Sequence, residues 1–150
     1  MKVIAENRKA RYDYHIFDTY EAGIALLGTE VKSLRAGRAN LQDAYAMMRG
    51  GELFLIGAHI APYERGGLYG SHDPYRTRKL LLHRHELSEI AGLVHQRGMT
   101  VVPLRISFSD AGLAKVQIAV AKGKKVYDKR RQIAERDARR EVERALRMKG

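Results

Sequence analysis

Residues 122–150 read KGKKVYDKRRQIAERDARREVERALRMKG and hold 12 Lys and Arg residues against 5 Asp and Glu residues. Arg136, Arg140, Arg144 and Arg147 recur at spacings of four, four and three, which places them along one side of a helix. Like charges at this spacing repel one another in water, whereas phosphates would neutralise them. Few apolar side chains are present to offset the ordering entropy, so we expect this tail to be disordered when free and helical when bound to a polyanion. A solvated helix or a flexible solubilising tail is the alternative.

Basic residues also lie beside aromatic residues near the start of the chain. Arg8, Lys9 and Arg11 lie just before the tyrosines at positions 12 and 14. Cations next to aromatic rings suit a sugar–phosphate backbone and unstacked bases. A second basic group, on or just after a short predicted helix, consists of Lys32, Arg35 and Arg38. Any one of these cations could simply be solvated, but together they favour RNA or DNA binding.

The histidines offer a different chemistry. His83 and His85 are two residues apart and could share a strand face, but no third ligand of defined spacing accompanies them, so we predict no metal site. Two imidazoles near Lys79 could perform general acid–base chemistry on a phosphodiester, which makes a small ribonuclease an alternative function. No G-x-S-x-G, Walker or H-E-x-x-H motif supports an enzyme. We therefore predict no catalytic residues and no cofactor.

Alternating hydrophobicity predicts the strands that must position these residues. Residues 12–27 alternate, and residues 44–60 form two runs around a Gly-Gly pair, as in a β-hairpin. Residues 102–108 and 116–120 alternate again. About five strands without a β-α-β rhythm indicate a mainly β fold with short α-helices, and an OB-type antiparallel barrel is one solution. Sandwiches and other small barrels would give a similar pattern.

Two helices and one long loop are predicted between the strands. Thr29 is expected to cap a short helix over residues 29–36, and residues 85–98 keep helical spacing up to a terminal glycine. The stretch 61–75 is rich in Gly and Pro and lacks periodicity, which predicts a long loop.

Length and charge distribution suggest one folded body with an appendage. The chain has 150 residues and a net charge of +11, of which +7 falls in the last 29 residues. We expect residues 1–121 to form an OB-like RNA-binding barrel and residues 122–150 to form a basic C-terminal tail. No window approaches the run of about 18 apolar residues that a membrane span requires. The lack of Cys and the charged N-terminal stretch predict a cytoplasmic location without a membrane partner.

Four stretches carry a resemblance to a known family: NRKARYDY, EAGIALLGTEVKSLRAGRANLQDAYA, HDPYRTRKLLLHRHEL and AKVQIAVAKGKKVYDKR. They extend from about Asn7 to Arg130 and closely resemble the SsrA-binding protein family, also called small protein B. GTEVKSLRAG followed at a distance by AKGKKVYDKR is the most specific signal. The resemblance implies an OB-type barrel with packed helices that binds the tRNA-like domain of transfer-messenger RNA, also called tmRNA or SsrA RNA.

The resemblance further implies a bacterial RNA-binding adaptor for trans-translation, the rescue of ribosomes stalled on messages without a stop codon. The expected partners are tmRNA and the ribosome, with the tail in the decoding region and the empty mRNA channel. The protein is expected to act as a monomer bound to RNA. A ribosomal or ribosome-assembly protein with an OB fold is the alternative among binding proteins.

Individual roles follow from the same resemblance. Glu21, Leu81 and Lys115 match family positions linked to RNA contact, and Gly123 matches the change from barrel to tail, where a missing Cβ permits a hinge. Asp128, Lys129 and Arg130 match the tail signature connected with the decoding region. The predicted RNA-binding residues of the body are Arg8, Lys9, Arg11, Glu21, Lys32, Arg35, Arg76, Arg78, Lys79, Leu81 and Lys115. The predicted tail residues are Gly123, Lys124, Lys125, Tyr127, Asp128, Lys129, Arg130, Arg136 and Arg140.

Overall fold

The computed structural model describes residues 2–63 and 71–149, with the side chains of residues 125–132 and 145–149 outside the description. Its elements, in chain order, are β1 (Lys2–Glu6), α1 (Arg8–Asp13), β2 (Tyr14–Ile24), α2 (Gly28–Arg35), β3 (Ala39–Asn40), β4 (Tyr45–Arg49), β5 (Glu52–Ile56), β6 (His59–Ile60), β7 (Arg78–Leu81), α3 (Arg84–Arg97), β8 (Thr100–Phe108), β9 (Ala114–Gly123) and α4 (Lys124–Lys149).

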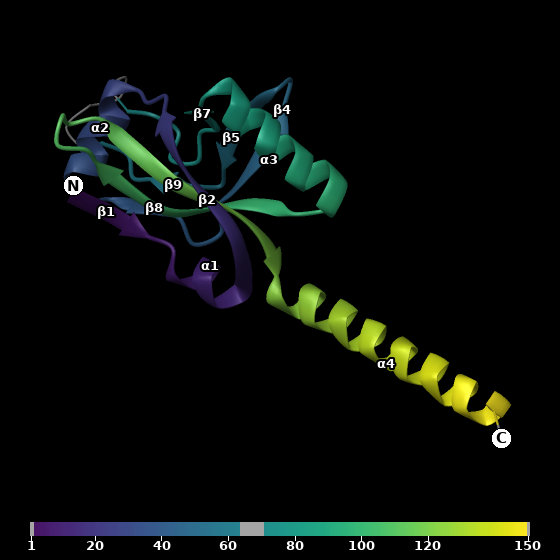
Figure 1. Ribbon diagram of the computed structural model, residues 1–150. Helices are drawn as coiled ribbons and strands as arrows, with labels where there is room; N and C mark the ends of the chain where they lie inside the picture. The colour runs from purple at the N-terminus through teal and green to yellow at the C-terminus, as the bar shows by residue number, and fades with distance from the viewer. Residues whose placement is uncertain (1, 64–70, 150) are drawn as a thin grey trace.

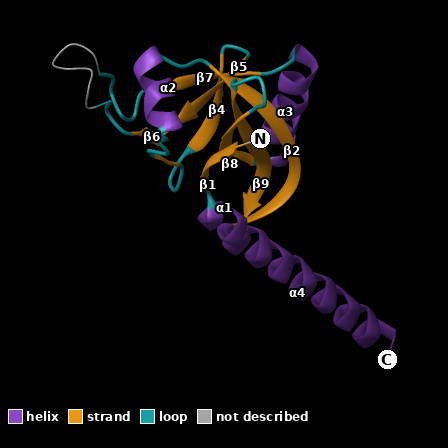
Figure 2. Ribbon diagram, turned by 90° about the vertical axis from the view of Figure 1, so that its left-hand side faces the viewer, coloured by secondary structure: helices purple, strands orange, loops and turns teal. Residues whose placement is uncertain are grey.

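The main sheet closes on itself to form a barrel. Its strands follow the order β1-β8-β4-β5-β7-β2-β9, every neighbouring pair is antiparallel, and a further pairing of β8 with β9 joins the two ends. β1 shares one edge of β8 with β4, so the closed ring consists of β8, β4, β5, β7, β2 and β9. The prediction of a mainly β, OB-type antiparallel barrel is confirmed (Figures 1 and 2).

The barrel interior is filled by one face of each strand. Along β2, the inward-facing Tyr20, Ala22 and Ile24 are buried, while Thr19 just before them and Glu21 between the first two are exposed. The period of two predicted over residues 12–27 is thus present from Tyr20 to Ile24, whereas a register shift separates Ile16 from Asp18, and Tyr14 and Ile16 pack against a second, smaller core. Other strands contribute to the same core, including Leu53, Leu55, Leu80, Val101, Ile106, Val116, Ile118 and Val120.

A second, smaller core lies on the outside of the barrel, under α1. Ala10 of α1 packs against Val102 and Leu104 of β8 and against Ala119 of β9. The buried Asn7 fixes the start of α1, because its side chain accepts from Ala10 N at 3.2 Å and donates to the carbonyl of Pro103 at 3.0 Å. The basic helix α1 is therefore fixed against the outer surface of the barrel.

The β4–β5 hairpin is confirmed, with Gly50 and Gly51 at its turn. Their φ angles are 60° and 78°, which are accessible to glycine without a steric penalty. Gly-Gly therefore satisfies the conformational demand of this tight turn.

The two helices predicted for the body are confirmed as α2 and α3, but the predicted cap of the first is wrong. α2 begins at Gly28 after an N-cap at Leu27, whose amide is bound by Glu30 Oε1 at 2.8 Å. Thr29 lies inside the helix, and its hydroxyl instead bonds His72 Nδ1 at 2.9 Å. A tertiary contact therefore takes the hydroxyl that the sequence assigned to local capping.

α4 continues directly from β9 and projects away from the barrel (Figure 1). The helical spacing read from the tail is therefore present in the structure, whereas disorder in the free protein stays a prediction. The predicted loop at 61–75 holds no helix or strand at residues 61–63 and 71–75, and residues 64–70 lie outside the described part of the chain.

No helix among the described residues combines the length and apolar character needed to cross a membrane.

Candidate RNA interface

Three of the predicted RNA-binding residues lie together on the outer wall of the barrel. Gly23 of β2 pairs with Leu81 of β7 on one side and with Lys115 of β9 on the other. Glu21 lies two residues before Gly23 and so faces the same side of the sheet. We call Glu21, Gly23, Leu81 and Lys115 the three-strand patch. Residues separated by 94 positions in sequence thus meet through strand pairing.

Leu81 contributes apolar surface to this patch. It is 50% exposed, and a Cβ added at Gly23 would lie only 3.3 Å from the Leu81 Cβ. The leucine side chain therefore lies over the glycine, and its exposure excludes a role in core packing. Leu81 and Lys115 lie on opposite sides of Gly23, so an exposed apolar side chain on β7 can contact a sugar or base while the lysine on β9 can reach phosphate.

Gln117 is a member of this surface that sequence reasoning missed. It pairs with Glu21 across β2 and β9, and its Oε1 atom is buried with no hydrogen-bond partner among the described residues. A buried acceptor without a partner is unusual in a folded protein. Only the pairing of the two strands reveals its place, since a lone glutamine carries no sequence signal.

The basic residues of α1 form a second exposed group. The Arg8 side chain is 93% exposed and Arg11 is also exposed. Lys9 pairs with Asp43 at 3.4 Å, and both of these side chains are open to solvent. Exposed pairs of this kind contribute little to stability, so these cations stay accessible to phosphate.

Lys32 and Arg35 lie on the exposed side of α2. The Lys32 ammonium sits 5.1 Å from the centre of the Tyr63 ring, which is cation–π range. Lys79, on β7, is half-exposed and lies 3.7 Å from Glu52. The structure thus leaves all three cations reachable from solvent.

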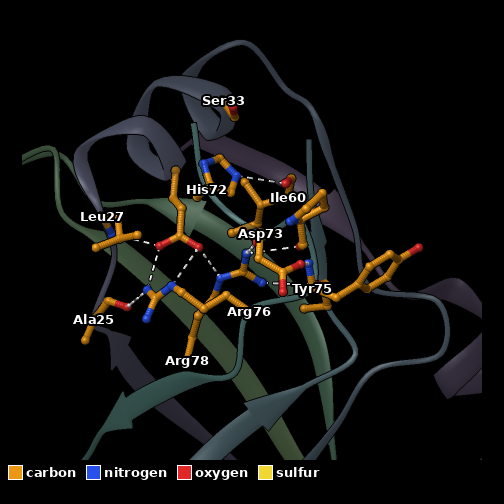
Figure 3. Close-up of polar contacts among 12 residues, drawn as sticks. Ala25, Leu27, Ser33, Ile60, His72, Asp73, Tyr75, Arg76 and Arg78 are labelled. Carbon is orange, nitrogen blue, oxygen red and sulfur yellow. Dashed lines mark hydrogen bonds and ion pairs between the residues drawn. The ribbon is translucent and has the colours of Figure 1, made fainter. Parts of the chain in front are cut away.

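Arg78 needs a correction, because its side chain is fully buried and cannot touch RNA. Its guanidinium donates to Glu30 Oε2, to the carbonyl of Ala58 at 2.8 Å and to that of Pro74 at 3.1 Å. Arg76 bonds the same carboxylate, with 2.6 Å between Nη2 and Glu30 Oε1 (Figure 3). Arg78 is therefore a structural residue, and Arg76, one-third exposed, is largely engaged by Glu30.

The carboxylate at the centre of this network is held in its charged form. Burial alone would raise the pKa of Glu30, but hydrogen bonds from Arg76, from the Leu27 amide and from Arg78 lower it below its ordinary value. The network ties α2 to the segment 72–78, because Thr29 also bonds His72, whose Nε2 lies 2.9 Å from the Ile60 carbonyl.

A different buried hydroxyl is predicted to titrate late. Burial, together with its hydrogen bond to Glu89 Oε2 at 3.1 Å, raises the pKa of Tyr20 to about 12. The neutral phenol is favoured by folding, so its contribution to stability is present below pH 10 and is lost between about pH 10 and 12. An absorbance titration should show one tyrosine ionising after the others. A Tyr20→Phe variant should lose that late step, and an unchanged curve would contradict the assignment.

The tail residues are described in part. Gly123 ends β9 opposite Tyr14, has no positive φ and has room for a Cβ, so a hinge there stays a prediction. The Lys124 ammonium lies 5.8 Å from the centre of the Tyr12 ring, which places the first turn of α4 beside α1. Exposed side chains further along α4 include Arg136 and Arg140. The side chains of Lys125, Tyr127, Asp128, Lys129 and Arg130 lie outside the description.

The histidine pair lies at the start of α3. The rings of His83 and His85 stack with centroids 5.6 Å apart, and the His83 amide donates to Glu86 at 3.0 Å. Within the described residues, no three His, Asp or Glu side chains form a group that could hold a metal ion.

A closed OB-type barrel with accessible cations on its wall and a basic helix extending from it defines a nucleic-acid-binding protein. The chain belongs to the SmpB protein family, whose model matches residues 4–148. The SsrA-binding protein of Salinispora arenicola is 61% identical over 144 residues, covering 96% of this chain and 89% of that protein. The SsrA-binding protein of Moorella thermoacetica is 56% identical over 147 residues, covering 98% and 94%.

A solved structure supports the same assignment. A chain from the structure described as "tmRNA-SmpB: a journey to the center of the bacterial ribosome" is 56% identical in sequence, with a TM-score of 0.67. The match covers 79% of this chain and 82% of that chain. The family resemblance drawn from the sequence motifs is confirmed.

Proposed function

We propose that this protein is an RNA-binding adaptor that binds the tRNA-like domain of tmRNA and delivers it to stalled bacterial ribosomes in trans-translation. The observation that carries the proposal is the membership of nearly the whole chain in the SmpB family, together with a relative solved as tmRNA-SmpB in the ribosome. Because the family acts by binding RNA, the protein requires neither catalytic residues nor a cofactor, and it works in the bacterial cytoplasm as a monomer bound to RNA.

The two parts of the chain are proposed to have separate tasks. The barrel of residues 1–121 binds tmRNA through the three-strand patch and the cations of α1 and α2. The tail of residues 122–150 enters the empty mRNA channel, where its basic residues meet ribosomal RNA at the decoding region. Its exposed arginines and its projection from the barrel support this division of labour. The free tail is proposed to be disordered and to become helical in the channel.

A reconstituted rescue assay tests the proposal. Ribosomes are stalled at the end of a message that lacks a stop codon and are given tmRNA with or without the purified protein. Release of the stalled ribosomes should depend on the protein. Equal release in its absence would overturn the proposed function, since an adaptor that is not required delivers nothing.

Replacement of Lys115 by Ala should weaken binding to the tRNA-like domain of tmRNA by about tenfold, the scale of one lost charge-assisted phosphate contact. Lys115 is half-buried beside Gly23, so its position is more fixed than that of a free surface lysine. The measurement is equilibrium binding to labelled RNA. Arg97→Ala, at the exposed end of α3, is the matched control and should change affinity little. Equal losses in both variants would show that net charge, rather than the patch, is measured.

A further inference from the structure

A polar hollow beside β3 and β6 is used by none of the roles described above. Its cavity volume is about 310 Å³, and it is lined by Asn40, Gln42, Asp43, Gly57, His59 and Tyr75. A neighbouring hollow of about 270 Å³ beside α1 shares Gln42 and Asp43 with it and includes Lys9. The first hollow thus has an aromatic side and a hydrogen-bonding side, and a cation lies at its edge.

The aromatic side is Tyr75, braced by His59. Tyr75 is 60% exposed, and its ring centroid lies 5.0 Å from that of His59 with an interplanar angle of 59°. The 5.0 Å separation leaves no room for a third ring between them, and the high exposure of Tyr75 leaves its side chain accessible to a base. Exposed aromatic rings in RNA-binding proteins act as platforms on which unstacked bases lie.

The platform is held in place by the buried ion network. The Tyr75 amide donates to Asp73 Oδ1 at 2.9 Å, and the Arg76 amide donates to the Asp73 carbonyl at 3.2 Å, which closes a turn over residues 73–76. The carbonyl of Pro74, the residue before Tyr75, accepts hydrogen bonds from Arg78 Nη2 at 3.1 Å and from the Ile60 amide at 2.9 Å. Figure 3 shows the Tyr75 ring directed away from this cluster. A pre-positioned ring loses little entropy when it binds a base.

The hydrogen-bonding side favours one base over the others. Asp43 presents a carboxylate, and its Oδ1 atom already pairs with Lys9 at 3.4 Å. A carboxylate only accepts hydrogen bonds, and guanine is the base that offers two adjacent donors, N1–H and N2–H. The side-chain amides of Asn40 and Gln42 can donate to the guanine O6. Gly57 has a φ of 78°, which favours glycine, and a Cβ added there would lie only 3.4 Å from the Asp43 carbonyl. The absence of a side chain at this position therefore leaves space in the hollow beside Asp43.

We propose that this hollow binds an unstacked guanine of a single-stranded RNA segment, with Tyr75 as the stacking platform and Asp43 as the reader of the base edge. The inference rests on the proposed function, since it assigns to an RNA adaptor one base-specific subsite. Lys9 is positioned to neutralise the phosphate next to the bound base.

Short oligoribonucleotides of equal charge test the proposal with the full-length protein. UUGUU, UUIUU and UUAUU differ only in the central base, and inosine lacks the N2 amino group of guanine. Binding measured by fluorescence anisotropy should favour guanine over adenine by about tenfold, with inosine between them. The tail attracts all three equally, so the ratio isolates the base. Equal affinities, or a preference for adenine, would overturn the proposal.

Variants separate the platform from the reader. Tyr75→Ala should reduce affinity for UUGUU by about tenfold, whereas Tyr75→Phe should retain it. Leu113→Ala, which removes an equally exposed side chain in the β8–β9 turn, is the control. Asp43→Asn should bring the guanine-to-adenine ratio close to one, and Asp110→Asn is its charge-matched control. An unchanged affinity of Tyr75→Ala for UUGUU, or an undiminished guanine preference in Asp43→Asn, would refute the site.

Footprinting then identifies the source of the base. Guanines of the tmRNA tRNA-like domain and of ribosomal RNA are probed with the wild-type protein and with Tyr75→Ala. Loss of protection at a guanine in either RNA supports the subsite and locates its partner. If every guanine is protected equally by both proteins while tmRNA is still bound, the subsite is wrong and the proposed function stands.

Discussion

Truncation of the chain after Lys122 is expected to abolish ribosome rescue while the barrel stays folded and keeps most of its specific affinity for tmRNA. The cut removes α4 but leaves β9 paired with β2 as far as the contact between His15 and Lys122. The core residues all lie before the cut. The removed segment, residues 123–150, holds 11 of the 28 Lys and Arg residues of the chain. Its loss therefore removes a large part of the attraction to ribosomal RNA.

Three measurements on the truncated protein separate these effects. Thermal unfolding reports the barrel, equilibrium binding to the tRNA-like domain reports recognition, and the reconstituted assay reports rescue. The expected pattern is a folded protein that binds tmRNA and rescues no ribosomes. A truncated protein that no longer distinguishes tmRNA from other RNA would contradict the assignment of recognition to the barrel.

Replacement of Arg78 by Met is expected to lower the free energy of unfolding by about 3–5 kcal/mol. Methionine fills similar space but leaves the Glu30 carboxylate buried without its inner partner, and the carbonyls of Ala58 and Pro74 lose a donor. Since domains of this size are stable by roughly 5–15 kcal/mol, the variant should be close to unfolding at ordinary temperature. Denaturant titration measures the loss.

The neighbouring residue provides the control for this prediction. Lys79→Met breaks an exposed ion pair on the same strand, which is expected to alter stability by less than about 1 kcal/mol. A similar small effect for Arg78→Met would show that the buried network contributes little.

The same network predicts that the stability of the protein depends on pH in the acid range. The folded-state pKa of Glu30 lies below its ordinary value, so the stability that its charged form contributes is present above the ordinary pKa. It is lost as the pH falls through the folded-state pKa. A Glu30→Gln variant should therefore lose less stability than the wild type over this acid range.

Local patterns predicted the parts of the fold that depend on local rules. The alternation through residues 12–27 became β2, and the glycine pair became the turn between β4 and β5. α3 ends at Arg97, just before the glycine expected to stop it. In each case one strand face, one turn or one helix end is determined by neighbouring residues, so spacing alone was sufficient.

Tertiary contacts decided what the patterns could not. α1 is a single helix of six residues held by Asn7 and by packing on the barrel, and so short a segment has no period to detect. Arg78 looked like one of several basic residues ahead of an apolar run, and only the distant Glu30 shows that it is buried. Glu21, Leu81 and Lys115 were matched one by one to a family pattern, whereas their meeting around Gly23 depends on strand register.

Competition between RNAs tests the central claim most directly. Full-length protein is bound to the labelled tRNA-like domain of tmRNA and is challenged with that domain unlabelled, with an unrelated tRNA and with a general RNA mixture at a salt concentration near that of the cell. We expect the unlabelled domain to displace the label at a concentration at least about tenfold below the others, since charge attraction is common to all three and only the barrel contacts are specific. Equal displacement by all three RNAs would contradict the proposal that this protein is a tmRNA adaptor.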